Sequence, residues 1–129
     1  MPQVELKRRL RWSDTDPAGR VYFPRIFDYV CDAEFELFRT CGIAPSDSVG
    51  FDFPRKHSEA TFHRMLLLEL PFVLRVWVGK LGRTSIRYDF QAFADEACTE
   101  LAAEGSMTVV AVKDGQPHEL PVALREKLS

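Results

Sequence analysis

Apolar and polar positions alternate along the chain with two different periods, and the change of period marks the predicted elements. Residues 4–12 carry an apolar side chain at nearly every second position, with charged residues between them. A period of two is typical of a strand with one buried face, so we expect a strand here. The apolar side consists of Val4, Leu6, Leu10 and Trp12, with Arg8 as its one charged member.

Residues 24–43 switch to the spacing of a helix. Their apolar side chains recur every three or four positions, and charged residues take the other side. This pattern predicts an amphipathic helix of about five turns. Pro24 suits its first turn, and Gly42 suits its C-terminal cap. The apolar face consists of Ile26, Phe27, Val30, Ala33, Leu37, Phe38 and Cys41.

Alternation returns after a connection that is rich in proline, glycine, serine and aspartate. Strands that follow a single helix predict an α+β fold, in which an antiparallel sheet carries the helix on one face. Val73, Trp77 and Phe93 lie opposite the main apolar rows of their strands, so we expect a partner sheet or a second subunit to cover the other face. The connection spans 43–57, the strands span 58–69, 72–81, 84–93 and 100–113, and a turn spans 113–117.

Composition limits the classes of protein to consider. The 129 residues fit one domain over 1–129. The net charge of -2 argues against a nucleic-acid partner. No apolar stretch reaches the ~20 residues of a transmembrane helix, and no signal peptide precedes the first strand, so we expect a cytoplasmic protein without membrane contact. The three cysteines, Cys31, Cys41 and Cys98, lack C-x-x-C spacing, so we expect reduced thiols and no metal site.

One stretch before the helix resembles a known family. The sequence DTDPAGRVYFP, followed by DYVCDAEFELFRTCGI, is similar to the active-site loop and central helix of hotdog-fold acyl-CoA thioesterases. The 4-hydroxybenzoyl-CoA thioesterase family is the most similar type. The resemblance rests on Asp14, Asp16, Pro17, Ala18, Gly19, Val21, Tyr22, Phe23, Pro24, Asp32, Ala33, Cys41 and Gly42.

This resemblance implies a fold, an assembly and an activity. The fold is a hotdog, a long central helix wrapped by an antiparallel sheet of five to six strands. The assembly is a homodimer that joins its sheets, or a dimer of dimers (a homotetramer), with the active site at the subunit interface. The activity is hydrolysis of an acyl-CoA thioester to the free acid and coenzyme A, with no cofactor apart from the coenzyme A of the substrate.

Within the motif, the resemblance assigns catalysis to Asp16, as the nucleophile or the general base. Thioester hydrolysis also needs donors for the oxyanion. A helix that begins at Pro24 leaves its first N–H groups free at the positive end of its dipole, so we expect the amide near Tyr22 and Phe23 to serve. From the residues alone, Asp16 could instead form an Asx-turn or cap the helix. For Asp14 we expect a hydrogen bond that fixes the loop.

Two further groups of residues are predicted to hold the substrate. Gly19, Val21 and Phe27 belong to the motif and its helix, while Glu59 and Thr61 could line the acyl pocket from a strand. The alternative for Glu59 and Thr61 is a solvated strand face. A flat apolar pocket would suit an aromatic or medium-chain acyl group, although the same aromatic side chains could simply form the core. They are Phe23, Phe27, Tyr29, Phe51, Phe53 and Phe62.

Coenzyme A carries phosphates, which basic and hydroxyl side chains bind. The turn between the second and third strands after the helix supplies such side chains, so we expect it to bind coenzyme A through Lys80, Arg83, Thr84, Ser85 and Arg87.

Three alternatives stay open: a thioester of an acyl carrier protein, a non-catalytic acyl-CoA-binding module, and a dehydratase. The absence of a histidine from the motif weighs against the dehydratase. Arg20 stands where the family often has an apolar residue.

Overall fold

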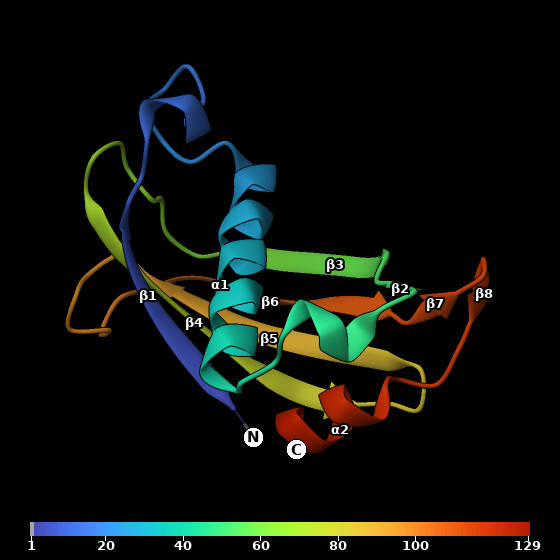
Figure 1. The fold of residues 1–129 in the computed structure, drawn as a ribbon. Helices are drawn as coiled ribbons and strands as arrows, with labels where there is room; N and C mark the ends of the chain where they lie inside the picture. Colours follow the sequence, from blue (N-terminus) through green and yellow to red (C-terminus); the bar gives the residue numbers. More distant parts are fainter. Residues whose placement is uncertain (1) are drawn as a thin grey trace.

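A five-stranded antiparallel sheet supports the fold, and one long helix lies across one of its faces (Figure 1). This computed structural model describes residues 2–129. The strands of the main sheet are β1 (Gln3–Arg9), β3 (Arg55–Phe62), β4 (Pro71–Leu81), β5 (Ser85–Phe93) and β6 (Leu101–Val110). The remaining elements are η1 (Trp12–Asp14), η2 (Phe23–Arg25), α1 (Ile26–Thr40), η3 (Pro45–Ser48), β2 (Phe51–Asp52), β7 (Val112–Lys113), β8 (Gln116–Pro117) and α2 (Val122–Leu128).

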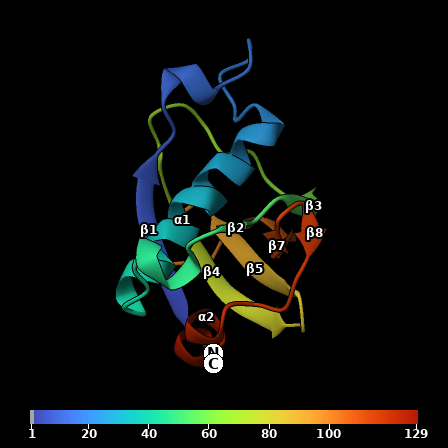
Figure 2. The same ribbon diagram turned by 45° about the vertical axis from the view of Figure 1, so that its right-hand side comes forward.

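The strand order places β1 and β3 at the two edges of the sheet. The order is β1-β4-β5-β6-β3, and β2, β7 and β8 form a small second sheet. Figure 2 shows α1 on one side of the large sheet, with α2 near the end where the β4–β5 turn lies. Strand β3 pairs only with β6, and its residues are mostly exposed.

The core lies between α1 and the sheet face that it covers. The pairing register brings the predicted apolar rows side by side, with Val76 opposite Phe90 and Val78 opposite Tyr88. Apolar side chains that leave water in this way supply most of the stability of such a fold. The buried apolar side chains of α1 are Ile26, Tyr29, Val30, Ala33 and Leu37.

The structure confirms the α+β prediction and the strands at 72–81 and 84–93, and it corrects the ends of two predicted strands. The first predicted strand stops at Arg9, because the chain turns at Trp12–Asp14. The predicted strand at 58–69 is wrong in its second half, because β3 ends at Phe62 and the following residues form a loop. Leu67 and Leu68 of that loop make single bridges to Arg20 and Leu10. Helix α2 was not predicted.

No helix within residues 2–129 has the length and apolar character that crossing a membrane requires.

Candidate functional site

The loop between β1 and α1 folds back on itself around a tight turn. The N–H of Gly19 donates to the Asp16 carbonyl at 3.0 Å, and the N–H of Asp16 donates to the Arg20 carbonyl at 2.8 Å. Gly19 has a φ of +78°, which favours glycine because other residues are strained there. The turn therefore returns the chain to the start of the helix, with Asp16 at its beginning.

The Asp16 carboxylate is held in place without being deeply buried. Its Oδ1 accepts hydrogen bonds from the N–H of Ala18 at 2.9 Å and of Arg20 at 3.3 Å. Its Oδ2 accepts from Arg20 Nε at 3.2 Å, and the side chain is 25% exposed. Asp16 thus forms the Asx-turn that its sequence context suggests, and its carboxylate is still open to solvent on one side.

The Asp14 carboxylate, in contrast, is buried and fixes the loop to the helix. Its Oδ2 accepts from the Tyr29 hydroxyl at 2.6 Å and from Arg11 Nε at 3.1 Å. Burial alone would raise the pKa of Asp14, but these two hydrogen bonds outweigh it and hold the pKa below its ordinary value. Burial, together with the bond to Asp14, raises the pKa of Tyr29 to about 12. The expected loop-fixing hydrogen bond of Asp14 is therefore present.

Only one of the two amides expected to bind an oxyanion is available. The N–H of Tyr22 already donates to the Asp14 carbonyl at 2.8 Å, which corrects the prediction for Tyr22. Pro24 has no N–H, and the N–H of Arg25 donates to the Tyr22 carbonyl at 2.8 Å. The Phe23 N–H donates no hydrogen bond to any residue of 2–129. It is therefore the free amide at the positive end of the η2–α1 helix.

Asp16 and Phe23 line the same hollow, which has a volume of about 260 Å³. Val21 lines it as predicted, whereas Gly19 lines a neighbouring hollow that Asp16 also lines. The loop after β3 supplies part of the wall, which was missed because that loop was predicted to be a strand. The hollow is lined by Asp16, Arg20, Val21, Tyr22, Phe23, Phe62, Arg64 and Met65.

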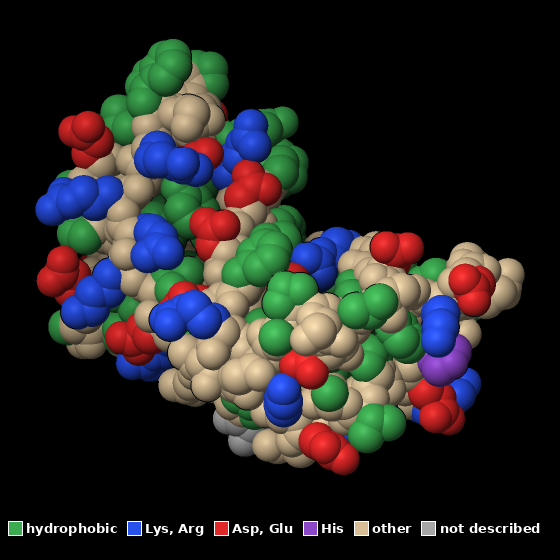
Figure 3. Space-filling model, in the orientation of Figure 1, with side chains coloured by type: hydrophobic (Ala, Val, Ile, Leu, Met, Phe, Trp, Pro, Cys, Tyr) green, Lys and Arg blue, Asp and Glu red, His purple; other side chains and the backbone are tan. Residues whose placement is uncertain are grey.

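Exposed apolar side chains surround this hollow. Figure 3 shows hydrophobic side chains gathered at the top of the molecule, over the loop between β1 and α1. Scattered exposed apolar residues are ordinary, but a group around one concave site indicates a surface that binds something apolar. Of the exposed apolar side chains, this hollow is lined by Tyr22, Phe23, Phe62 and Met65, and the adjoining hollows are lined by Trp12, Leu67 and Leu70.

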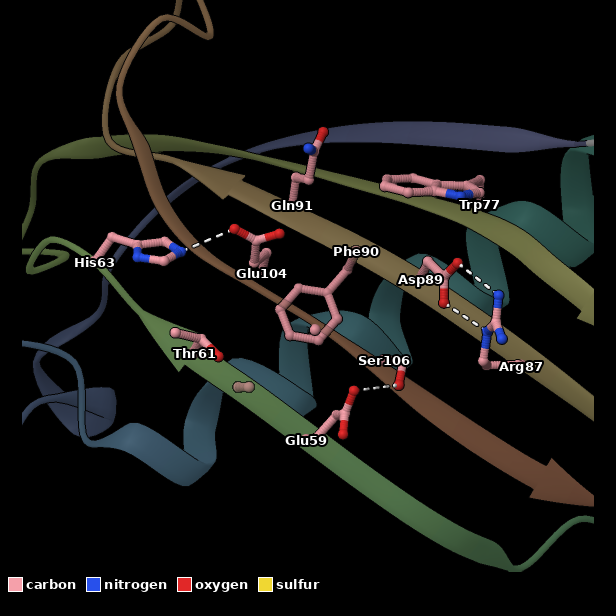
Figure 4. Close-up of a pocket in the computed structure, with 12 residues that line it drawn as sticks. Glu59, Thr61, His63, Trp77, Arg87, Asp89, Phe90, Gln91, Glu104 and Ser106 are labelled. Atoms are coloured by element: carbon pink, nitrogen blue, oxygen red, sulfur yellow. Dashed lines mark hydrogen bonds and ion pairs between the residues drawn. The ribbon is translucent and has the colours of Figure 1, made fainter.

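Three residues predicted to bind the substrate lie elsewhere. Phe27 is partly buried and packs edge-on against Phe90, with ring centroids 6.1 Å apart. Glu59 and Thr61 point to the sheet face opposite α1, because Phe62 and Ala60 alternate with them toward the helix. There they line a separate, open hollow of about 530 Å³ (Figure 4). In one chain, these three residues are not part of the Asp16 site.

The hollow opposite α1 contains internally paired charges. Figure 4 shows Arg87 bound to Asp89, His63 to Glu104, and Ser106 to Glu59. These pairs leave few free polar groups for a ligand. The alternative that Glu59 and Thr61 belong to a solvated strand face therefore fits their surroundings.

The predicted coenzyme A residues lie at the opposite end of the sheet from Asp16. They surround the β4–β5 turn, whereas the Asp16 loop lies beyond the other end of β4 (Figures 1 and 2). Strand β4 has 11 residues, which at ~3.3 Å each span roughly 35 Å. Arg83 pairs with Glu119 at 3.3 Å. One chain does not bring Lys80, Arg83, Thr84, Ser85 and Arg87 to its own Asp16.

Among residues 2–129, no group of three or more histidine, cysteine, aspartate or glutamate side chains could hold a metal ion. The three cysteines are free and partly buried.

Solved structures of other proteins share the arrangement of this chain. A 1,4-dihydroxy-2-naphthoyl-CoA thioesterase from Synechocystis is 18% identical, with a TM-score of 0.87 over 98% of this chain and 95% of that one. A DHNA-CoA thioesterase from Staphylococcus aureus is 21% identical, with a TM-score of 0.83 over 93% of this chain and 82% of that one. A hypothetical protein from Aquifex aeolicus is 21% identical, with a TM-score of 0.88 over 98% and 99%.

No family model and no curated protein sequence matches the chain. At identities this low, structural likeness is evidence of a common fold and not of a common reaction. The long helix, the five-stranded antiparallel sheet and these neighbours confirm the predicted architecture. The chain has the hotdog fold.

The pKa of Asp14 leads to a prediction about stability and pH. Because folding lowers that pKa, the ionised carboxylate stabilises the folded protein above about pH 5. This contribution is lost as the pH falls below the ordinary pKa of ~3.9 and through the lower pKa of the folded state. We expect Asp14→Asn to lower the free energy of unfolding by about 1–3 kcal/mol at pH 7 and by less near pH 3. Chemical denaturation of both proteins between pH 3 and 8 measures the difference.

Asp52→Asn is the matched control, because Asp52 is exposed and takes part in no ion pair within residues 2–129. It should change the free energy of unfolding by less than ~0.5 kcal/mol. A difference for Asp14→Asn that stays constant down to pH 3 would contradict the role of its carboxylate.

Proposed function

We propose that this protein hydrolyses acyl thioesters of coenzyme A at the hollow that Asp16 and Phe23 line. One observation supports this most strongly: a residue with a partly exposed carboxylate and a residue with a free backbone N–H line one apolar hollow. Hydrolysis needs both groups, a carboxylate to attack or to activate water, and a donor for the oxyanion. The named thioesterases among the structural neighbours are examples of this fold carrying the same reaction class.

Two routes use these groups. In the first, an Asp16 oxygen attacks the thioester carbon, the carbonyl oxygen becomes an oxyanion at the Phe23 N–H, and the C–S bond breaks. Coenzyme A leaves as a thiolate, which takes up a proton, and water then hydrolyses the mixed anhydride. In the second, Asp16 takes a proton from a water molecule that attacks the same carbon. Both routes release the free acid and coenzyme A.

The walls of the hollow favour an apolar acyl group. Phe23, Phe62 and Met65 supply apolar surface beside the Asp16 carboxylate. Aromatic rings and a flexible methionine side chain can pack against a flat aromatic group or a medium-length chain. We therefore propose an aromatic or medium-chain acyl group as the substrate.

We propose that the working form is a homodimer that joins β3 of one subunit to β3 of the other. Strand β3 is an exposed edge of eight residues, and such an edge readily pairs with another strand. In a full antiparallel overlap, Phe62 of one subunit faces Arg55 of the partner subunit. Arg55 is held by Glu34 through two bonds of 3.0 and 2.7 Å. The partner would thereby close the open side of the hollow.

The same dimer accounts for the distant basic turn. The β4–β5 turn lies at the end of the sheet where β3 begins. After the two-fold rotation, the partner's turn lies at the end where the first subunit has Asp16. It would stand about three strand spacings from β3, or roughly 14 Å. Coenzyme A could then bind with its thioester at one subunit and its phosphates near Arg83 of the partner subunit.

The second candidate function is binding of acyl-CoA without turnover. It is favoured by the three donors that already occupy the Asp16 carboxylate, two backbone N–H groups and Arg20 Nε.

A carrier-protein thioester is an alternative substrate for the same chemistry, because it presents the same acyl group on phosphopantetheine. Thiol release from acyl-CoA and from acyl carrier protein separates these cases.

For Asp16→Asn, we expect thiol release from acyl-CoA to fall by several orders of magnitude while acyl-CoA binding changes little. The amide keeps the shape of the side chain but cannot attack or accept a proton. A thiol-reactive dye measures release from a panel of aromatic and aliphatic acyl-CoAs, and calorimetry measures binding. Equal release by wild type and variant would contradict catalysis by Asp16, and binding without release in both would favour the binding module.

The Phe23 amide can be tested because its N–H is not needed for folding. Tyr22 is extended, at φ -70° and ψ 116°, and proline at the first position of a helix is well tolerated. Phe23→Pro removes the N–H and the ring, whereas Phe23→Ala removes the ring alone. We expect the proline variant to have a kcat about 100-fold below that of the alanine variant. Equal kcat values in two folded variants would show that the amide binds no oxyanion.

The proposed dimer leads to a test by mass and activity together. The N–H of His63 points toward Ala102 of β6, and ladder bonds alternate, so the N–H of Ser58 should point away from the sheet. We expect sedimentation to give twice the 14.8 kDa chain mass for wild type and Ser58→Ala. Ser58→Pro should sediment as a single chain and lose activity. A wild-type monomer with full activity would contradict this assembly.

A further inference from the structure

The loop that carries Asp14 and Asp16 is tied to α1 by a hydroxyl that the proposed chemistry does not use. Tyr29 is 4% exposed, and its ring packs edge-on against Phe72 of β4 with centroids 5.0 Å apart. The ring is therefore fixed by close packing, and its hydroxyl has a defined position. That hydroxyl donates to Asp14 Oδ2 at 2.6 Å. A side chain of the core thus holds a residue of the Asp16 loop.

Asp14 passes this restraint to the backbone at the start of the helix. Its side chain accepts from Tyr29, and its carbonyl accepts from the Tyr22 N–H at 2.8 Å. The Tyr22 carbonyl in turn accepts from the Arg25 N–H at 2.8 Å. Both backbone polar groups of Tyr22 are therefore occupied.

Peptide geometry carries the restraint one step further. The Tyr22 carbonyl and the Phe23 N–H belong to one planar trans peptide, so they point in opposite directions. When the carbonyl is held by Arg25, the free N–H of Phe23 has a fixed direction.

We propose that Tyr29 is a positioning residue for the oxyanion donor, acting through Asp14 on the peptide that presents the Phe23 N–H. The inference rests on the proposed function and adds to it a residue of α1, outside the loop that carries Asp16. Arg11 is the other donor to Asp14, but its side chain is 71% exposed, so solvent competes for it. Tyr29 is the buried donor in this group. A shift of the amide by about 1 Å is enough to cost a large part of the rate.

A second buried tyrosine provides the matched control. Tyr88 is fully buried on β5, and its hydroxyl has no hydrogen-bond partner within residues 2–129. Both Tyr29→Phe and Tyr88→Phe remove one buried hydroxyl and leave the ring. Only the first removes a bond that leads to the Phe23 amide.

The experiment measures thioester hydrolysis and amide exchange on the same three proteins. We expect Tyr29→Phe to lower kcat about tenfold or more, with KM close to wild type, because the misplaced amide stabilises the transition state less well. Tyr88→Phe should keep both constants within about twofold of wild type. Hydrogen exchange followed by NMR should show faster exchange of the Tyr22 amide in Tyr29→Phe, with the sheet amides unchanged.

Two results would overturn the inference. One is a Tyr29→Phe variant with wild-type kcat and unchanged exchange at Tyr22. The other is faster exchange over the whole sheet, which would mean that the hydroxyl only stabilises the fold. If wild type releases no thiol from any thioester, the proposed function fails, and the Tyr22 exchange rate still decides whether Tyr29 holds this peptide in place.

Discussion

A buried carboxylate needs hydrogen-bond donors inside the protein, and the Asp14 carboxylate determines how the chain enters its helix. Left unpaired, the group would be costly to bury, so the loop closes only where Tyr29 and Arg11 reach it. Once Asp14 is fixed, its carbonyl holds the Tyr22 amide, and Asp16 begins the turn two residues later. Asp16 and the Phe23 amide therefore both lie on a loop that the contacts of Asp14 fasten to α1.

In the single chain the hollow is open, and it lies beside an unpaired edge of the sheet. Apolar side chains stand exposed around it, and β3, which contributes Phe62, is an unpaired edge. Exposed apolar surface and an open strand edge are both features that proteins usually cover. A second subunit on β3 would cover both, and it would bring a basic turn to the end of the sheet that lacks one. Catalysis and assembly would then depend on the same strand.

The sequence predicts those parts of the fold in which local periodicity and packing agree. The strand prediction at 84–93 holds because Ile86, Tyr88, Phe90 and Ala92 all face α1. The prediction at 58–69 fails after Phe62, because consecutive leucines carry no alternation and the loop is set by distant contacts with Leu10 and Arg20. Local pattern alone could not predict those contacts, since they depend on how separate segments pair.

The candidate site divides in the same way. The local context of Asp16 and Asp14 indicates the Asx-turn and the loop-fixing bond, since both are contacts between near neighbours in the sequence or across one helix start. The catalytic role that the resemblance assigns to Asp16 stays a prediction. The motif does not distinguish Phe23 from Tyr22, because that depends on which amide Asp14 occupies. Tyr29 was predicted only as one of several aromatic side chains for the pocket, and its hydroxyl bond requires the folded loop.

The most direct test of this account is a crystal structure with an acyl-CoA analogue in which a methylene group replaces the thioester sulfur. The ketone cannot be hydrolysed, so its carbonyl reports where the thioester binds. We expect its oxygen within about 3.2 Å of the Phe23 nitrogen, and its carbonyl carbon within about 3.5 Å of an Asp16 carboxylate oxygen or of a water molecule bound to that oxygen. A carbonyl bound away from Phe23, with Asp16 still held only by its own turn, would contradict the account.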